Sequence, residues 1–282
     1  MPELPEVETV RVGLERVLAG RRLTRVEARR PDLRFPLPEG FVQRLTGARV
    51  VGLTRRGKYM LAALDRQTTL ILHLGMTGRF EITCAGRRPG SAAPPDPKHA
   101  HVIFETEDGA VITFYDPRRF GFMDLVADGD LSTHPRLADL GIEPLGPEFG
   151  RGYLQSAFAG RRQSAKTLLL DQRIVAGLGN IYVCEALHLA KVSPIKPAGK
   201  VRARQLDALA GAVRQVLREA IVAGGSTLRD FASVDGELGY FQHRFTVYGR
   251  EGEPCLTDAC DGEIRRRVQS GRSSFYCPRC QR

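Results

Sequence analysis

The stretch MPELPEVETVRVGLERVLAG, residues 1–20, decides how the chain begins to fold. Its apolar residues recur at helical spacing until Gly20 interrupts them, namely Val7, Val10, Leu14, Val17 and Leu18. This pattern predicts an amphipathic helix that packs one face against a core. Such a helix would hold the N-terminus of the chain in a fixed place.

The chemistry of that terminus depends on Pro2 and Glu3. A proline after the initiator methionine is small enough for the methionine to be removed, which would leave Pro2 as a free secondary amine. An α-amino group has a pKa of about 8, so a fraction is unprotonated at neutral pH and can attack carbon to form an iminium ion. Glu3 is placed to move protons. The alternative is that both residues simply start a helix, and these two residues alone favour that alternative.

Composition narrows the class of protein. A chain of 282 residues is long enough for two domains, or for one large domain and a small module. The net charge of +10 indicates a polyanionic partner. No apolar run approaches the roughly 20 residues of a membrane span, and acidic residues stand where a signal peptide needs basic ones. We therefore expect a cytoplasmic protein without membrane segments, whose six cysteines are metal ligands or free thiols.

Two secondary-structure regimes follow the first helix. Residues 23–126 contain short runs rich in β-branched and aromatic residues, and Asp108-Gly109 is a strong hairpin signal. The runs are 49–53, 59–64, 69–74, 102–106 and 111–115. They predict a sandwich or barrel-like domain. Residues 85–97 interrupt it as a loop, and the Pro- and Gly-rich residues 135–152 indicate a link between domains.

Beyond that link the pattern is helical. Ser164 is a candidate N-cap for a helix to about Asp171, and Asn180 for a second helix to about Leu189. A longer third helix, marked by apolar residues from Leu206, ends at the glycine pair 224–225.

The C-terminal stretch carries two cysteine pairs. Cys255 and Cys260 enclose four residues, Cys277 and Cys280 enclose two, and sixteen residues lie between the pairs. This spacing lets all four thiolates reach one ion, and a closed four-thiolate site predicts one structural zinc. Arginines surround the second pair, namely Arg265, Arg266, Arg267, Arg272, Arg279 and Arg282. A zinc-stiffened hairpin that carries them is suited to read nucleic-acid phosphates or a groove.

Pro2-Glu3 at the start of the chain and the arginine-bearing cysteine module at its end occur together in one family. The sequence resembles bacterial formamidopyrimidine-DNA glycosylase. The matching motifs are MPELPEVET, RRGKYM, HLGMTGRF, KHAHV, DPRRFG, VAGLGNIYVCEAL, GGSTLRDF, YGREGEPC and GRSSFYCPRCQR. The resemblance implies an α+β multi-domain protein in three parts. These are a catalytic β-sandwich with an N-terminal helix (1–134), a helix–two-turn–helix domain (135–245) and a zinc-finger module (246–282).

The resemblance also implies the chemistry. Enzymes of this family remove 8-oxoguanine and formamidopyrimidines from double-stranded DNA and nick the strand by β,δ-elimination. Pro2 would form the Schiff base with C1′ of a flipped nucleotide, and Glu3 would act as its acid/base partner. Lys58 and Arg272 would serve the elimination steps. Because a guanidinium hardly deprotonates, we interpret Arg272 first as a phosphate clamp.

DNA contacts are implied by the same motifs. Met76, Arg118 and Phe120 would fill the hole left by the flipped base. The phosphate contacts would be His73, His99, Arg161 and Asn180, together with Lys58 and Arg272. The base pocket would hold Glu6, Ser226, Thr227 and Tyr240, under a glycine-containing segment of residues 226–241 that could close as a lid. The resemblance implies no nucleotide cofactor, and we expect a monomer.

Some features depart from the family, and two alternative functions stay open. Four residues between Cys255 and Cys260 exceed the usual two, and Arg161 stands where a lysine is common. An endonuclease VIII-like enzyme for oxidised pyrimidines typically begins Pro-Glu-Gly-Pro, whereas Leu4 here favours the purine branch. A non-catalytic zinc-finger DNA-binding protein would have no use for Pro2 and Glu3.

Overall fold

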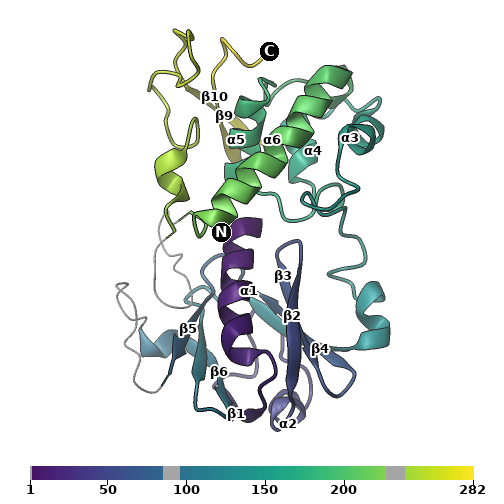
Figure 1. Ribbon diagram of the computed structural model, residues 1–282, viewed down its shortest axis with the longest axis vertical. Helices are drawn as coiled ribbons and strands as arrows, with labels where there is room; N and C mark the ends of the chain where they lie inside the picture. Colours follow the sequence, from purple (N-terminus) through teal and green to yellow (C-terminus); the bar gives the residue numbers. More distant parts are fainter. Residues whose placement is uncertain (1, 85–95, 227–238) are drawn as a thin grey trace. The chain divides into compact units, whose positions relative to one another are not determined.

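The computed structural model describes residues 2–84, 96–226 and 239–282 (Figure 1). The chain divides into two compact units. One consists of Met1–Ala138 with Ala223–Tyr240, and the other of Asp139–Val222 with Phe241–Arg282. The predicted order, β-rich first and helical second, is confirmed. The return of residues 223–240 to the first unit was not predicted.

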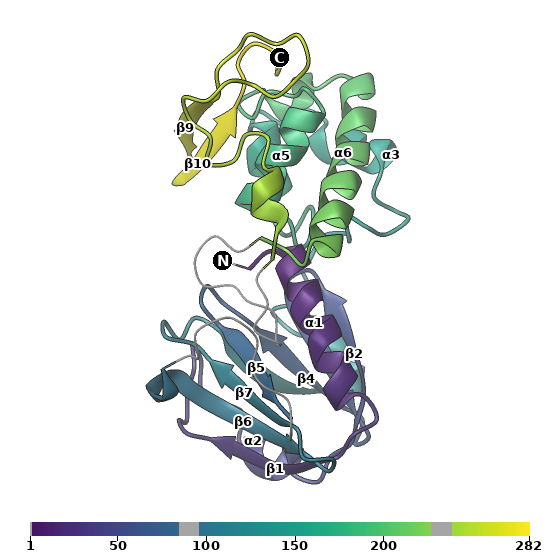
Figure 2. The ribbon, with the colours of Figure 1, turned by 60° about the vertical axis from the view of Figure 1, so that its left-hand side comes forward.

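The first unit is a sandwich of two antiparallel sheets and an N-terminal helix (Figure 2). One sheet has the order β1 (Leu23–Ala28), β6 (Ala100–Thr106), β7 (Val111–Tyr115), β5 (Arg79–Thr83). The other has the order β2 (Val50–Arg56), β3 (Tyr59–Leu64), β4 (Thr68–His73), β8 (Phe122–Ala127). The helices are α1 (Leu4–Leu18) and the short α2 (Phe41–Leu45). The predicted sandwich is thereby confirmed.

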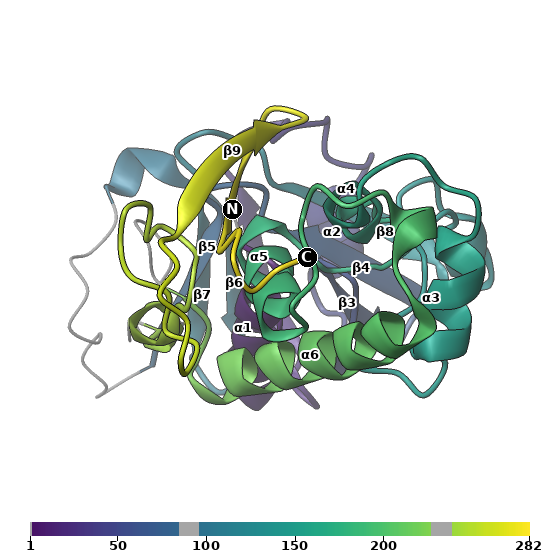
Figure 3. The same ribbon diagram turned by 90° about the horizontal axis from the view of Figure 1, so that it is seen from above.

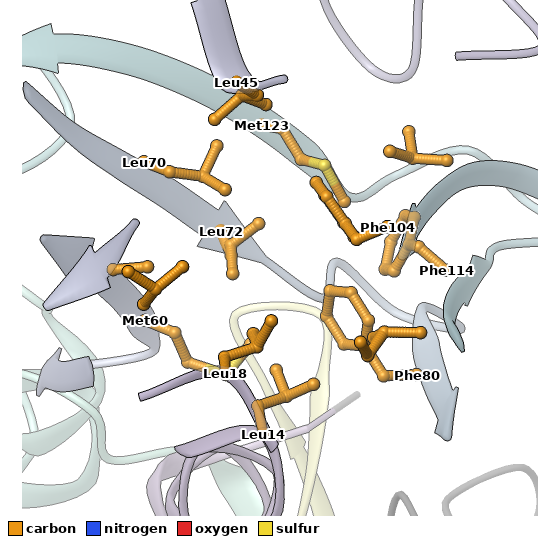
Figure 4. Close-up of a cluster of buried hydrophobic side chains, with 14 of the residues drawn as sticks. Leu14, Leu18, Leu45, Met60, Leu70, Leu72, Phe80, Phe104, Phe114 and Met123 are labelled. Atoms are coloured by element: carbon orange, nitrogen blue, oxygen red, sulfur yellow. The ribbon is translucent and has the colours of Figure 1, made fainter. Parts of the chain in front are cut away.

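Apolar side chains from both sheets and α1 form one core in this unit. Leu14 of α1, Met60 and Leu72 of one sheet and Phe104 and Phe114 of the other lie in it (Figure 4). Strand β7 alternates half-buried and buried residues, as the pleat requires. The hairpin predicted from Asp108-Gly109 joins β6 to β7, and Gly109 has a φ of 83°, which favours glycine.

The second unit is helical and ends in a two-stranded hairpin (Figure 3). Its elements are α3 (Arg151–Phe158), α4 (Ala165–Leu170), α5 (Asn180–Leu189), α6 (Ala203–Val222), β9 (Arg265–Gln269) and β10 (Arg272–Tyr276). The Ser164 cap is confirmed, because its hydroxyl accepts the N–H of Thr167. None of the helices among the described residues combines the length and apolarity of a membrane span.

One prediction about helix starts was wrong. Asn180 is not the N-cap of α5; Gly179 takes that position and Asn180 is the first helical residue. The side-chain amide of Asn180 instead donates to the carbonyl of Ser273, 2.9 Å away on the hairpin. The side chain of Asn180 is therefore bonded to a residue far along the chain and is not available as an N-cap.

A partly buried charge cluster fixes α1 to the sheet beside it. Glu8 accepts hydrogen bonds from Arg11 at 2.8 Å and from Arg55 of β2 at 2.9 Å. Arg11 also donates to the carbonyl of Leu53. Burial acts to raise the pKa of Glu8, but hydrogen bonds and charges from Arg11 and Arg55 outweigh it and lower that pKa. This cluster holds the helix whose first residues carry the candidate catalytic groups.

Replacing Glu8 with Gln should destabilise the protein by about 1.5 kcal/mol, because two charged hydrogen bonds with little solvent access are lost. The matched control is Glu105→Gln, whose partner Arg25 is 60% exposed. That change should cost less than about 1 kcal/mol. Urea unfolding of both variants measures the difference, and equal losses would contradict the anchoring role of Glu8.

Candidate functional site

The N-terminus of α1 is a buried site built around two carboxylates. Pro2 is buried, and Glu3 and Glu6 are only 3% and 2% exposed. The backbone N–H of Glu3 donates to Glu6 at 2.8 Å, as in a capping box. The other oxygen of Glu6 accepts the N–H of Ser226 at 2.8 Å and its hydroxyl at 3.1 Å. Glu6 thus joins the start of the helix to a segment more than 200 residues later.

Ser226 and Tyr240, which lie 14 residues apart in the sequence, are neighbours in the structure. Ser226 pairs with Tyr240 in an isolated bridge, and Tyr240 donates its N–H to the carbonyl of Ala223. A Cβ on Gly239 would lie 2.4 Å from the carbonyl oxygen of Gly225, so only glycine fits there. Of the predicted base pocket, Glu6, Ser226 and Tyr240 are brought together at this junction. Thr227 and Gly236 of the predicted lid lie outside the described residues.

Lys58 and His73 lie close to one another at one end of the sheet that contains β3 and β4. Lys58 is buried in the turn between β2 and β3, and its neighbour Tyr59 is paired in register with His73 at the end of β4. Burial first, and then the charges of Lys58, Arg34 and Arg136, lower the pKa of His73 to about 4. The ring is therefore neutral at physiological pH.

The hydrogen bonds of His73 also fix its tautomer. Its Nδ1 accepts the backbone N–H of Gly75 at 3.1 Å, so the ring proton must be on Nε2. The side chain is thus a neutral donor. This agrees with the predicted phosphate contact and needs no positive charge on the ring.

Two turns present the predicted wedge residues to solvent. Met76 and Phe120 are each 38% exposed, and Arg118 is exposed between them in sequence. Asp116, which is fully buried, accepts the hydroxyl of Thr77 at 2.6 Å and the N–H of Gly121 at 2.7 Å. It therefore joins the turn of Met76 to the turn of Arg118 and Phe120. The buried Asp116 was not predicted from the sequence.

The histidines of KHAH have separate environments. His99 ends a short 3-10 helix, and its carbonyl accepts the N–H of Asp116. His101 is buried, and its Nε2 is 2.9 Å from the carbonyl of Asp116. The one metal-ligand cluster among the described residues lies elsewhere. Arg161 is exposed after α3.

In the helical unit Asn180 is bonded to the backbone of the β9–β10 hairpin, at the residue that follows Arg272. Ser273, next to Arg272, offers its carbonyl both to Asn180 and to Lys166, each at 2.9 Å. Lys166 is 1% exposed and also donates to the hydroxyl of Ser274 at 2.7 Å. The Oδ1 of Asn180 is buried and has no hydrogen-bond partner among the residues that the structure describes. Lys166, absent from the sequence prediction, therefore fixes strand β10 to helix α4.

The four predicted cysteines form one cluster whose Sγ atoms all lie within 4.8 Å of one another. Cys255 and Cys280 are 3.8 Å apart, and Cys260 and Cys277 are 3.7 Å apart. Zinc–sulfur bonds of about 2.3 Å in a tetrahedron give sulfur–sulfur distances of about 3.8 Å. The donor set therefore fits one zinc ion with no open coordination position.

Helix α5 supports this cluster through Glu185, which sequence reasoning missed. Its carboxylate accepts the backbone N–H groups of Thr246, Val247 and Tyr248 and the hydroxyl of Thr246, at 2.6 to 3.0 Å. The residues missed in this way, Asp116, Lys166 and Glu185, are buried charged groups. Their partners in the fold are too distant in sequence, apart from Gly121, for a local pattern to indicate them.

Replacing His73 with Gln tests its neutral state through pH. In the unfolded chain His73 binds a proton below about pH 6.5, whereas in the folded chain it does so only near pH 4. Between these pH values the unfolded state binds more protons, so the free energy of unfolding falls as the pH falls. From about pH 7 to about pH 5 the advantage of wild type over the variant should shrink by about 2 kcal/mol. Urea unfolding at both pH values measures it. A constant difference would show that His73 titrates normally.

Replacing Gly262 with Ala should weaken zinc binding. A Cβ there would lie 2.7 Å from the Sγ of Cys277 and 3.3 Å from that of Cys260. Disturbed ligands typically lower metal affinity by about 10-fold or more. Competition with a chromogenic chelator measures the affinity. Gly211→Ala, where nothing lies within 4 Å of the new Cβ, is the control and should keep wild-type zinc affinity.

Comparisons with known proteins agree with this arrangement. Family models match three consecutive parts of the chain. They are the formamidopyrimidine-DNA glycosylase N-terminal domain (residues 1–123), its H2TH domain (residues 140–232) and the zinc finger found in FPG and IleRS (residues 252–282).

Full-length relatives carry the same name. Formamidopyrimidine-DNA glycosylases of Phenylobacterium zucineum and a Caulobacter species are each 64% identical, over all of both chains. Among solved structures, a Lactococcus lactis FPG mutant with Fapy-dG-containing DNA has a TM-score of 0.87 and 33% identity, over all of both chains. The MutM (FPG) protein of Thermus thermophilus has a TM-score of 0.85 and 40% identity, over 99% and 98% of the two chains.

Proposed function

The chain belongs to the formamidopyrimidine-DNA glycosylase family, and we propose that it excises oxidised purines through a Schiff base on Pro2. It is accordingly a base-excision repair glycosylase, with the lyase activity general to that family. The observation that best supports Pro2 is the buried start of α1, where two carboxylates flank a terminus fixed by Glu6.

Attack by the Pro2 nitrogen on C1′ breaks the bond to the damaged base. Glu3 supplies or removes the proton as the sugar ring opens. The iminium ion acidifies the C2′ proton, so β- and then δ-elimination expels the two phosphates. In this scheme Lys58 assists elimination, and Arg272 holds phosphate. Ser226, Thr227 and Tyr240 line the base pocket with Glu6, and the segment between them closes over the flipped base.

Phosphate binding is distributed over both units. His73 donates from Nε2 and Asn180 from its amide, while His99, Arg161, Lys58 and Arg272 add contacts. When the amide of Asn180 turns from the Ser273 carbonyl to a phosphate, that carbonyl keeps a hydrogen bond, because Lys166 also donates to it. Met76, Arg118 and Phe120 fill the helix where the base has left, and their exposure supports this role.

The zinc ion is structural. Its four thiolates, from Cys255, Cys260, Cys277 and Cys280, hold the residues that flank the arginine-bearing hairpin and leave no position for substrate. We further propose that the protein works as a monomer in the cytoplasm on nucleoid DNA, without a nucleotide cofactor. The division into parts 1–134, 135–245 and 246–282 belongs to the same proposal.

The decisive test is trapping with borohydride. Untagged protein incubated with a duplex carrying 8-oxoguanine opposite cytosine should form a covalent adduct at Pro2, and mass spectrometry locates it. The same protein with an uncleaved extension before Pro2 should bind the duplex and form no adduct, because its nitrogen is an amide.

The alternatives give different outcomes. Adduct formation on an oxidised pyrimidine but not on 8-oxoguanine would favour the endonuclease VIII-like branch. Binding without adduct or strand nicking, by zinc-loaded protein that begins at Pro2, would favour a non-catalytic DNA-binding protein.

A further inference from the structure

Three arginines and two phenylalanines alternate along one edge of the first unit. The guanidinium carbon of Arg118 lies 4.6 Å from the ring centroid of Phe120, and that of Arg34 lies 5.8 Å from the same ring. Arg34 is also 5.7 Å from the ring of Phe35, and Arg136 stacks over that ring at 4.2 Å. We call this row, Arg118–Phe120–Arg34–Phe35–Arg136, the arginine ladder.

Hydrogen bonds from backbone N–H groups fix the middle of the arginine ladder and its Arg136 end. Arg34 donates its N–H to the carbonyl of Gly121, beside Phe120. Arg136 donates its N–H to Nδ1 of His134, whose Nε2 is 3.1 Å from the carboxylate of Asp124 in β8. The backbones of Arg34 and Arg136 are therefore held in place by hydrogen bonds.

Rings also connect the ladder to His73. Phe35 packs edge-on against Phe122 at 5.8 Å, and Phe122 stacks on His73 at 5.3 Å with an interplanar angle of 20°. The charges of Arg34 and Arg136 are close enough to lower the pKa of His73, after burial and Lys58. The ladder thus runs from the wedge residues to the neutral phosphate donor.

The guanidinium groups of the ladder contrast with several other arginines of this unit, which are paired with carboxylates. Arg21, Arg25 and Arg49 are paired with carboxylates at 2.6 to 3.1 Å. Within the described parts of the chain, the guanidinium groups of Arg34, Arg118 and Arg136 have neither a carboxylate nor a hydrogen-bond partner. A guanidinium that stacks by its face keeps its in-plane N–H donors available, and these match phosphate oxygens.

We infer that the arginine ladder is a phosphate track, in which Arg136 and Arg34 bind backbone phosphates of the DNA beyond the wedge. The inference rests on the proposed function, because the ligand is the duplex that the enzyme repairs. It adds two phosphate ligands to those implied by the family motifs. Phe35 is exposed and has no role in the catalytic scheme. In the phosphate track its ring orients the guanidinium groups of Arg34 and Arg136.

The test is the salt dependence of binding to a duplex with a tetrahydrofuran abasic analogue, which cannot react. Each phosphate contact contributes a slope of about −0.9 in log K against log salt. The affinity advantage of wild type over Arg136→Gln should therefore shrink about 3.5-fold from about 50 to about 200 mM salt. Arg136→Lys should restore the slope but bind less tightly, because an ammonium does not stack on Phe35 as a planar fork.

Arg25→Gln is the matched control, since it removes the same charge from an arginine already paired with Glu105. It should leave the slope at the wild-type value. Equal slopes for wild type and Arg136→Gln would overturn the phosphate track while leaving excision by wild type intact. Wild type that neither binds this duplex nor forms the borohydride adduct would instead contradict the proposed function.

Discussion

The carboxylate of Glu6 is the interaction on which the catalytic end of the molecule depends. One oxygen fixes the backbone of Glu3, and the other fixes Ser226, which belongs to a late segment of the chain. A carboxylate buried to this extent is tolerated only when its lone pairs are occupied by donors. The helix start and the segment at Ser226 must therefore form together. A terminus that would otherwise fray becomes rigid.

The same principle recurs wherever an exposed functional group has to be held still. Asp116 lies beneath the turns of Met76 and Phe120, Lys166 beneath the hairpin of Arg272, and Glu185 beneath the loop that leads to the zinc cluster. Leaving such a buried charged group without one of its hydrogen-bond partners typically costs about 1 to 3 kcal/mol or more. Met76, Phe120 and Arg272 are exposed, whereas Asp116 and Lys166, which hold the turns and the strand that carry them, are buried.

The sequence predicted the elements well where the signal was local. Strands at residues 59–64 and 111–115, the Asp108-Gly109 hairpin, the Ser164 cap and the cysteine cluster needed only spacing and propensity. Local patterns failed where a partner far along the chain decided the outcome. Asn180 was predicted to cap a helix because its type favours caps, yet its amide reaches a carbonyl 93 residues away.

The candidate site divides in the same way. Its motif residues could be identified from the sequence together with the family resemblance, whereas the supports could not. A lysine in a short helix resembles any solvent-exposed lysine until the fold buries it, as happens to Lys166. The return of residues 223–240 to the first unit was also invisible, because no local pattern encodes which unit a segment rejoins.

The contrast between paired and stacked arginines has a consequence for how the protein finds its target. Carboxylates locally compensate arginines such as Arg21 and Arg25, so much of the formal +10 charge lies elsewhere. Among the described residues the guanidinium groups of the arginine ladder have no such carboxylate, so this row of cations attracts a polyanion before contact. On undamaged DNA this attraction favours a loosely held, correctly facing encounter that can slide along the helix. The proposed phosphate track would thereby turn lesion search into diffusion in one dimension, with the arginine ladder facing the DNA.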